Sequence, residues 1–231
     1  MRKIYLLFVF VMMMASTASA QLDSILLANS KLIDIKKYSD HKNSPYYFDD
    51  WVVGSIIGTN RGMIDSVLLN YNGYTRAFEI KVGDRYIKLN DRFFIRVVVD
   101  ARRNNLNEEL GRRIVFQKGI HPKFSKDFLT LNYTGRNVFL VSQFVTGIQK
   151  SEQLNLVAGA LEEFRTFTPK KLYFLMQDGD IKQIKLKKKS VIKALGYKKQ
   201  LSNYLKENKN NLKTEKDLHR LLAYYDTIVE D

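Results

Sequence analysis

The sequence predicts an α+β protein, mainly antiparallel β, in which a curved sheet or sandwich is followed by a C-terminal helical segment. Between Trp51 and Val99, turn-forming residues recur about every ten positions, and the runs between them are rich in β-branched and aromatic side chains, which is typical of strands joined by hairpins. Near the C-terminus the apolar residues change to a helical spacing. Hydrophobic residues make up 45% of the chain, so we expect a packed core.

The N-terminus has the pattern of a secretory signal peptide. It starts with two basic residues, continues with an unbroken apolar run over residues 4–14, and carries Ala18-Ser19-Ala20 as a cleavage sequence ahead of Gln21. We therefore expect a signal peptide over residues 1–20. The mature chain is expected to be exported to the periplasm or the cell exterior and to be soluble.

A lead-in segment is predicted over residues 21–44, followed by a β-rich domain over residues 45–186. Hairpin turns are expected at Asn72-Gly73, where both residues tolerate the positive φ of a type I′ turn, around Gly135, and at Asp178-Gly179. The later strands are predicted over residues 113–117, 128–133, 138–144, 171–177 and 180–186. The polar stretch 149–155 is predicted to be a link to the following region, which has no clear pattern.

A lysine-rich helical segment is predicted over residues 188–228, packed on the β-rich domain. Ser190 is expected to cap a first short helix that ends at Gly196. A second helix is predicted from Tyr197 to about Asn208. Thr214 and Asp217 have the spacing of a capping box for a third helix. The apolar stripe of this third helix has i, i+3, i+4, i+7 spacing and consists of Leu218, Leu221, Leu222 and Tyr225.

The chain contains no cysteine. Disulfides, a thiolate nucleophile and the lipid attachment of a bacterial lipoprotein are therefore excluded. Outside the signal peptide, every apolar run is far shorter than the roughly 20 residues that a spanning helix needs. We expect no transmembrane segment in the mature chain.

Positive charge is concentrated near the C-terminus. The net charge is +14, and residues 182–216 hold twelve lysines against only Glu207 and Glu215. Lysines attract anions as hydrated point charges, so this segment is a candidate polyanion-binding surface; the alternative is a solvated face that only keeps the protein soluble. The candidate residues are Lys185, Lys187, Lys188, Lys189, Lys198 and Lys199.

A second candidate site is an aromatic cluster at the start of the β-rich domain. Tyr46, Tyr47 and Trp51 could form a platform that stacks on a sugar ring or a base. The alternative interpretation is that alternate rings face the core while the others cover a sheet edge.

No constellation in the sequence predicts catalysis. His41, His121 and His219 are far apart and lack the local spacing of metal ligands. The adjacent acids Asp49-Asp50 and Glu162-Glu163 point in different directions on any regular element, so neither pair predicts a glycosidase site. We assign no catalytic, cofactor-binding or metal-binding residue and expect no cofactor.

Several segments resemble a group of uncharacterised exported proteins of Bacteroidetes-type Gram-negative bacteria. The similar segments are Tyr46-Tyr47-Phe48-Asp49-Asp50-Trp51 through Gly54, Leu69-Asn70-Tyr71-Asn72, Leu201-Ser202-Asn203-Tyr204-Leu205-Lys206-Glu207-Asn208 and Leu221-Leu222-Ala223-Tyr224-Tyr225. The resemblance implies a periplasmic or secreted β-rich protein with a helical end, and it implies no catalytic residues.

These observations favour a non-enzymatic secreted or periplasmic envelope protein that binds a partner or ligand. The expected partners are an envelope protein, a glycan or an anionic lipid headgroup, and export makes nucleic acid an unexpected partner. Two alternatives stay open. One is a carrier or sensor of an apolar or glycolipid ligand, and the other is a hydrolase whose carboxylates assemble only in the fold.

Overall fold

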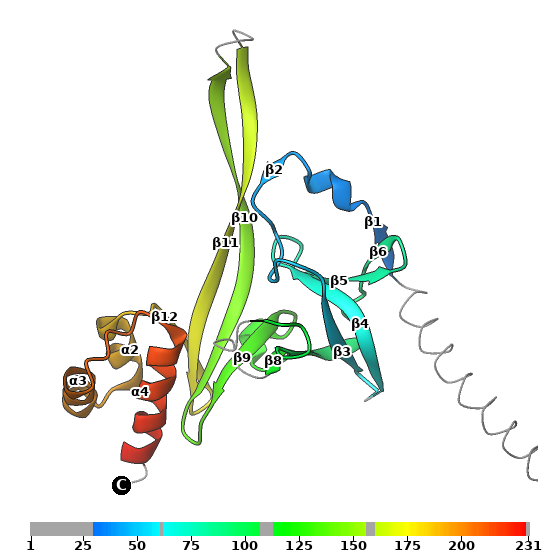
Figure 1. Cartoon of the computed structure of the whole chain (residues 1–231). Coiled ribbons are helices and arrows are strands. Elements are labelled where there is room, and N and C mark those ends of the chain that lie inside the picture. Colours follow the sequence, from blue (N-terminus) through cyan, green and yellow to red (C-terminus); the bar gives the residue numbers. More distant parts are fainter. Residues whose placement is uncertain (1–29, 61, 107–112, 156–159, 230–231) are drawn as a thin grey trace, which may run out of the picture.

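The computed structural model describes residues 30–60, 62–106, 113–155 and 160–229. These residues form one open, curved, 12-stranded sheet and three α-helices near the C-terminus (Figure 1). The strand order is β1-β6-β5-β4-β3-β7-β8-β9-β10-β11-β12, and β2 pairs in parallel with β11. The predicted class, α+β and mainly antiparallel β, is confirmed.

The strands are β1 (Lys31–Ile33), β2 (His41–Lys42), β3 (Val52–Gly58), β4 (Met63–Asn72), β5 (Ala77–Val82), β6 (Arg85–Lys88), β7 (Phe94–Asp100), β8 (Arg113–Lys118), β9 (Phe128–Thr134), β10 (Phe139–Asn155), β11 (Ala160–Gln177) and β12 (Asp180–Ile184). The helices are the 3-10 turns η1 (Ile35–Tyr38) and η3 (Pro122–Phe124), and the α-helices α2 (Lys188–Leu195), α3 (Lys198–Glu207) and α4 (Glu215–Ile228).

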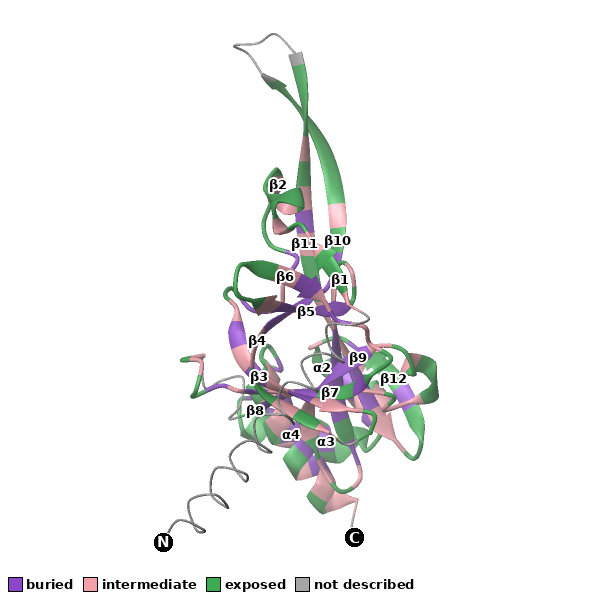
Figure 2. Cartoon of the chain, turned by 90° about the vertical axis from the view of Figure 1, so that its right-hand side faces the viewer, coloured by how far each residue is buried: buried purple, intermediate pink, exposed green. Residues whose placement is uncertain are grey.

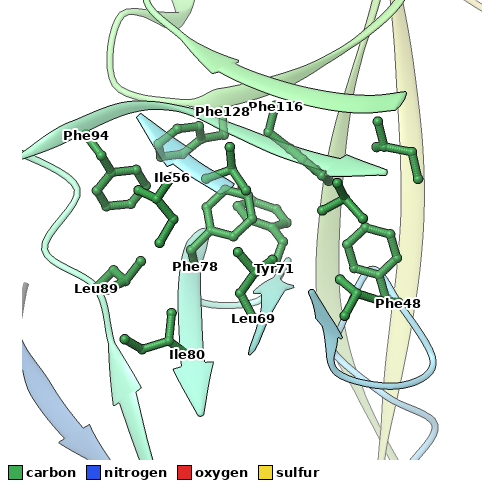
Figure 3. Packing of buried hydrophobic residues seen from close by; sticks show 14 of the residues in the cluster. Phe48, Ile56, Leu69, Tyr71, Phe78, Ile80, Leu89, Phe94, Phe116 and Phe128 are labelled. Carbon is green, nitrogen blue, oxygen red and sulfur yellow. The ribbon is translucent and has the colours of Figure 1, made fainter. Parts of the chain in front are cut away.

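The first part of the sheet curls around an aromatic core (Figure 3). Phe78 on β5 lies at its centre, with its ring centroid 5.0 Å from Tyr71, 5.1 Å from Phe116 and 5.2 Å from Phe128. Phe94 stacks on Phe128 at 5.2 Å. Rings that meet edge-on or tilted in this way gain energy beyond the area they bury, so strands far apart in the sequence are joined by one cluster.

The three α-helices pack on one face of the sheet formed by β10, β11 and β12. Their apolar side chains form a buried cluster with Val138, Leu140, Leu175 and Ile184 of the sheet segment. The predicted stripe of α4 is fully buried in this cluster, and the predicted capping box at Thr214 and Asp217 is present; both predictions are confirmed. The opposite face of these strands packs against the segment that contains η3.

The long hairpin of β10 and β11 extends beyond the rest of the molecule (Figures 1 and 2). We call its outer half, residues 147–155 and 160–168, the arm. The base of the arm contacts residues 38–43. His41 stacks on Phe167 at 4.7 Å, Tyr38 meets the same ring edge-on at 5.3 Å, and the Asn43 amide donates to the Phe167 carbonyl at 3.1 Å. Phe167 is buried, while most of the arm beyond it is exposed.

The prediction of a polar link in the arm is wrong. Residues 149–155, predicted to be a link, belong to β10, and β11 begins well before the predicted strand at Lys171. The physical reason is that an element exposed on both faces needs no apolar alternation, so the pattern that identifies half-buried strands is missing there. The strands are held by pairing with each other in a continuous register from Phe139 with Met176 to Asn155 with Ala160.

The β4–β5 turn and the start of α2 also differ from the predictions. The hairpin of β4 and β5 exists, but the positive φ occurs at Arg76 rather than at Asn72 or Gly73. The Asn72 side-chain oxygen accepts hydrogen bonds from the Tyr74 and Thr75 amides and shapes a longer turn. Ser190 does not cap α2, since its hydroxyl instead accepts from the Lys185 amide at 3.0 Å.

By contrast, the turn at Asp178-Gly179 has positive φ at both residues, as predicted. The predicted signal peptide, residues 1–20, lies outside the described residues. Of the helices that the structure describes, none combines the length and apolar character required to cross a bilayer.

Candidate functional site

The six lysines predicted to bind polyanions lie at the starts of two helices. Lys185 follows β12, Lys187 is the N-cap of α2, Lys188 and Lys189 lie in the first turn of α2, and Lys198 and Lys199 begin α3. All six are exposed, and among the described residues their ammonium groups have no carboxylate partner. The lysines near the start of α2 and those at the start of α3 form two groups separated by the length of α2, because α3 begins just after α2 ends. We call these six residues together the lysine surface.

The local electrostatics of the lysine surface are unfavourable without an anion. Neither α2 nor α3 has a side-chain cap or an acidic residue in its first turn, so their amide groups and their lysines present positive charge at the same place. The third helix is built in the opposite way, because α4 begins with a capping box and the acids Glu215 and Asp217. Anions near the first two helix starts would therefore reduce an existing repulsion.

The predicted aromatic platform is divided between two environments. Tyr47 packs into the core against Phe116 and Phe144, at 5.0 Å and 5.2 Å. Tyr46 and Trp51 lie together, 5.9 Å apart and both half-buried, and Trp51 also contacts Tyr86 at 5.1 Å. The structure thus brings two of the three predicted rings together.

A buried carboxylate, Glu79, lies beneath Tyr46. The Tyr46 hydroxyl donates to Glu79 Oε2 at 2.6 Å, and the Asn72 amide donates to Oε1 at 3.0 Å. Burial raises the pKa of Glu79, and these two hydrogen bonds only partly oppose that effect. Sequence reasoning missed this residue, since a single acid in a strand of mixed polarity gives no indication that it will be buried.

A second polar cluster joins α4 to the sheet. Glu215 accepts hydrogen bonds from Lys171, from the Tyr173 hydroxyl at 2.7 Å and from the Asn132 amide at 2.8 Å. Burial alone would raise the pKa of Glu215, but the charge of Lys171 and these hydrogen bonds outweigh it and leave the pKa lowered. On the same helix, His219 has its pKa lowered, mainly by burial.

Replacing Glu215 with Gln should make stability less dependent on pH. A lowered carboxyl pKa means that the ionised group stabilises the fold above its ordinary value of 4.5, and that this contribution is lost as the pH falls through the lowered value. We expect Glu215→Gln to lower the free energy of unfolding by about 1–3 kcal/mol at neutral pH. Urea denaturation at several pH values measures this loss.

The difference from wild type should shrink as the pH falls below 4.5. Glu207→Gln, which changes an exposed acid on α3, is the matched control and should change the unfolding curve little at any of these pH values. An equal loss of stability from Glu215→Gln at acidic and neutral pH would contradict the assignment of the ionised carboxylate to this cluster.

The three histidines lie in separate parts of the structure. His41 pairs with Asp40 at 2.8 Å, and His121 contacts the Gly179 carbonyl at 3.1 Å, so the three histidines do not converge. Within the part of the chain that the structure describes, no group of three or more His, Asp or Glu side chains is arranged to hold a metal ion.

Three surface hollows that are lined by described residues lie away from the lysine surface. One of about 340 Å³ is lined by residues 75–77 and 88–91, together with Lys31. One of about 480 Å³ lies between residues 133–136 and the end of α4. The third, of about 500 Å³, lies between residues 32–36 and 84–86, and Tyr86 connects it to Trp51.

No protein-family model matches the chain, and neither a curated protein nor a solved structure matches it.

Proposed function

We propose that this protein is an exported, non-enzymatic envelope protein that binds an anionic partner through its lysine surface. The observation that carries the proposal is the coincidence of six exposed, unpaired lysines with two uncapped helix starts, within the described residues. The partner chemistry that fits is a membrane surface rich in lipid phosphates, since lysines give salt-sensitive attraction without fixed geometry.

Two further features support this proposal. Export is supported by the signal-peptide pattern of residues 1–20. A non-enzymatic role is supported by the buried Glu79 and the half-buried Glu215, because both carboxylates are engaged by hydrogen bonds that hold parts of the fold together.

The test is binding to lipid vesicles that contain phosphatidylglycerol, with phosphatidylcholine vesicles for comparison. The test variant replaces five lysines with glutamine: Lys187, Lys188, Lys189, Lys198 and Lys199. Since each lysine near an anionic surface contributes about 1 kcal/mol, we expect at least about a hundredfold weaker binding. Wild-type binding should also weaken as the salt concentration rises.

The matched control removes the same charge from exposed lysines elsewhere: Lys31, Lys36, Lys123, Lys126 and Lys170. This variant should retain most of the wild-type affinity for the vesicles, because charges dispersed over the protein attract an anionic membrane less strongly than lysines that are close together. Equal binding by the two variants would rule out the lysine surface. Recovery of the native protein with Met1 still attached would rule out export.

A further inference from the structure

The arm has an open strand edge. Thr146 is the last residue of β10 whose outward amide has a partner, since it donates to the Gly73 carbonyl at 3.1 Å. Because outward-facing groups alternate along a strand, the amides and carbonyls of Ile148, Lys150, Glu152 and Leu154 point away from β11. In the described residues no strand pairs with this edge, since β2 lies on the β11 side. Such an edge is a template for another strand.

Side chains on one face of the arm are arranged in like pairs. In the β10–β11 register Ile148 lies opposite Phe167, Lys150 opposite Arg165, Glu152 opposite Glu163, and Leu154 opposite Leu161. Like charges directly opposite each other destabilise a hairpin. Leu154 and Leu161 are 53% and 67% exposed, so much of their apolar surface is accessible to a partner.

Only part of this charge is compensated within the chain. Glu163 accepts from Lys150 at 3.2 Å and from Arg165 at 2.9 Å. Glu152 has no cationic partner among the described residues. The arm therefore leaves one carboxylate, two leucines and a row of main-chain groups available to a partner.

We propose that two copies of this chain associate by antiparallel pairing of their β10 edges, about a two-fold axis at Ser151. In this register Lys150 of each copy lies opposite Glu152 of the other, and Ile148 lies opposite Leu154. In the resulting four-stranded sheet, the Lys150–Arg165 pair of one copy lies beside the Glu152–Glu163 pair of the second copy. The basic pair of each copy therefore lies next to the acidic pair of the other copy, and the apolar pairs lie next to each other. Such a surface is self-complementary, which an isologous interface requires.

The main-chain geometry agrees with the same register. A two-fold axis at Ser151 places outward-facing residues opposite outward-facing residues, so their amides and carbonyls can exchange hydrogen bonds. An axis at Lys150 would place two lysines opposite each other, and an axis at Glu152 would place two glutamates opposite each other. Among these three registers, only the axis at Ser151 places opposite charges together, and the bound occupant is a second copy of this chain.

The test uses two single charge reversals on the full mature chain, Lys150→Glu and Glu152→Lys. Sedimentation velocity on wild type, from micromolar to several hundred micromolar, should show a monomer–dimer equilibrium, because a short edge pairing buries little surface. Each variant alone places like charges opposite each other twice and should dimerise at least about tenfold more weakly.

Mixing the two variants provides the sharpest outcome. In a mixed dimer the glutamate introduced by Lys150→Glu lies opposite the lysine introduced by Glu152→Lys, and the second pair keeps the native Glu152 opposite the native Lys150. The mixture should therefore associate about as tightly as wild type. The double variant Lys150→Glu/Glu152→Lys should also regain association. Matched controls are Lys182→Glu and Glu207→Lys, which make the same charge changes at exposed positions away from the arm.

Hydrogen exchange locates the contact. In wild type at high concentration, the outward amides of Lys150 and Glu152 should exchange slowly. In the Lys150→Glu variant, the outward amides at these two positions should exchange quickly. The Ser151 amide faces β11 and should be protected in both proteins. Far-UV circular dichroism checks that each variant is folded. A monomeric wild type throughout the concentration range, dimers insensitive to the charge reversals, a mixture that fails to associate, or unprotected outward amides in a wild-type dimer would each overturn the proposal.

Discussion

Leu221→Asp is expected to lower the free energy of unfolding by about 4 kcal/mol or more, which is a large part of the stability of a typical domain. Leu221 is 0% exposed and lies in the cluster that joins α4 to the sheet. The substitution removes apolar contacts and places a carboxylate where the neighbouring side chains are mainly hydrocarbon. Urea denaturation followed by far-UV circular dichroism measures the loss.

Ala223→Asp is the matched control for this prediction. It adds the same charge to the same helix at an exposed position, and it should lower the free energy of unfolding by only about 1 kcal/mol, mainly through the lower helix propensity of Asp. Leu221→Ala provides a measurable second variant if Leu221→Asp does not fold, with an expected loss of about 2–5 kcal/mol. A Leu221→Asp protein as stable as Ala223→Asp would show that α4 does not pack on the sheet.

Phe78→Ala is expected to cost about 3–5 kcal/mol, because it removes the ring at the centre of the aromatic core. Phe78 is 0% exposed and touches rings from four other strands, namely Tyr71, Phe94, Phe116 and Phe128. The cavity left behind cannot close easily, since those strands are fixed by their own pairings. Unfolding followed by the fluorescence of Trp51, the single tryptophan, measures the effect.

Phe93→Ala tests whether the cost comes from burial rather than from the loss of any phenylalanine. The Phe93 ring is 39% exposed, and its contact with Thr59 is made by the main-chain carbonyl, which the substitution retains. We expect a loss below about 1 kcal/mol. Similar losses from both variants would mean that Phe78 is not at the centre of the core.

Sequence reasoning was most accurate where burial imposes a period on the chain. The stripe on α4 was identified because its four apolar residues share one helix face, and the capping box was identified because its residues have a fixed spacing. The lysine surface was found from composition alone, since twelve lysines in one segment are visible without a structure. The uncapped starts of α2 and α3 depend on backbone geometry and could not be read from the sequence.

The arm and the two carboxylates that join distant segments were missed for a common reason. Residues 149–155 look like a polar link because a two-stranded ribbon in water has no buried face to select apolar residues. Glu79 and Glu215 look like ordinary surface acids, because their partners come from segments distant in sequence: Tyr46 for Glu79, and Lys171 and Asn132 for Glu215. Contacts of this kind exist only after the strands have paired.

Composition and short-range periodicity were enough to predict the strand-rich class, the helical C-terminal segment, the concentration of lysines and the absence of thiol chemistry. Three features depend on the tertiary structure: the strands form one open sheet, the β10–β11 hairpin protrudes from it, and, among the described residues, Lys150 and Glu152 lie along an unpaired edge of that hairpin. Register and side-chain facing depend on pairings between segments far apart in the chain, and a local pattern cannot specify them.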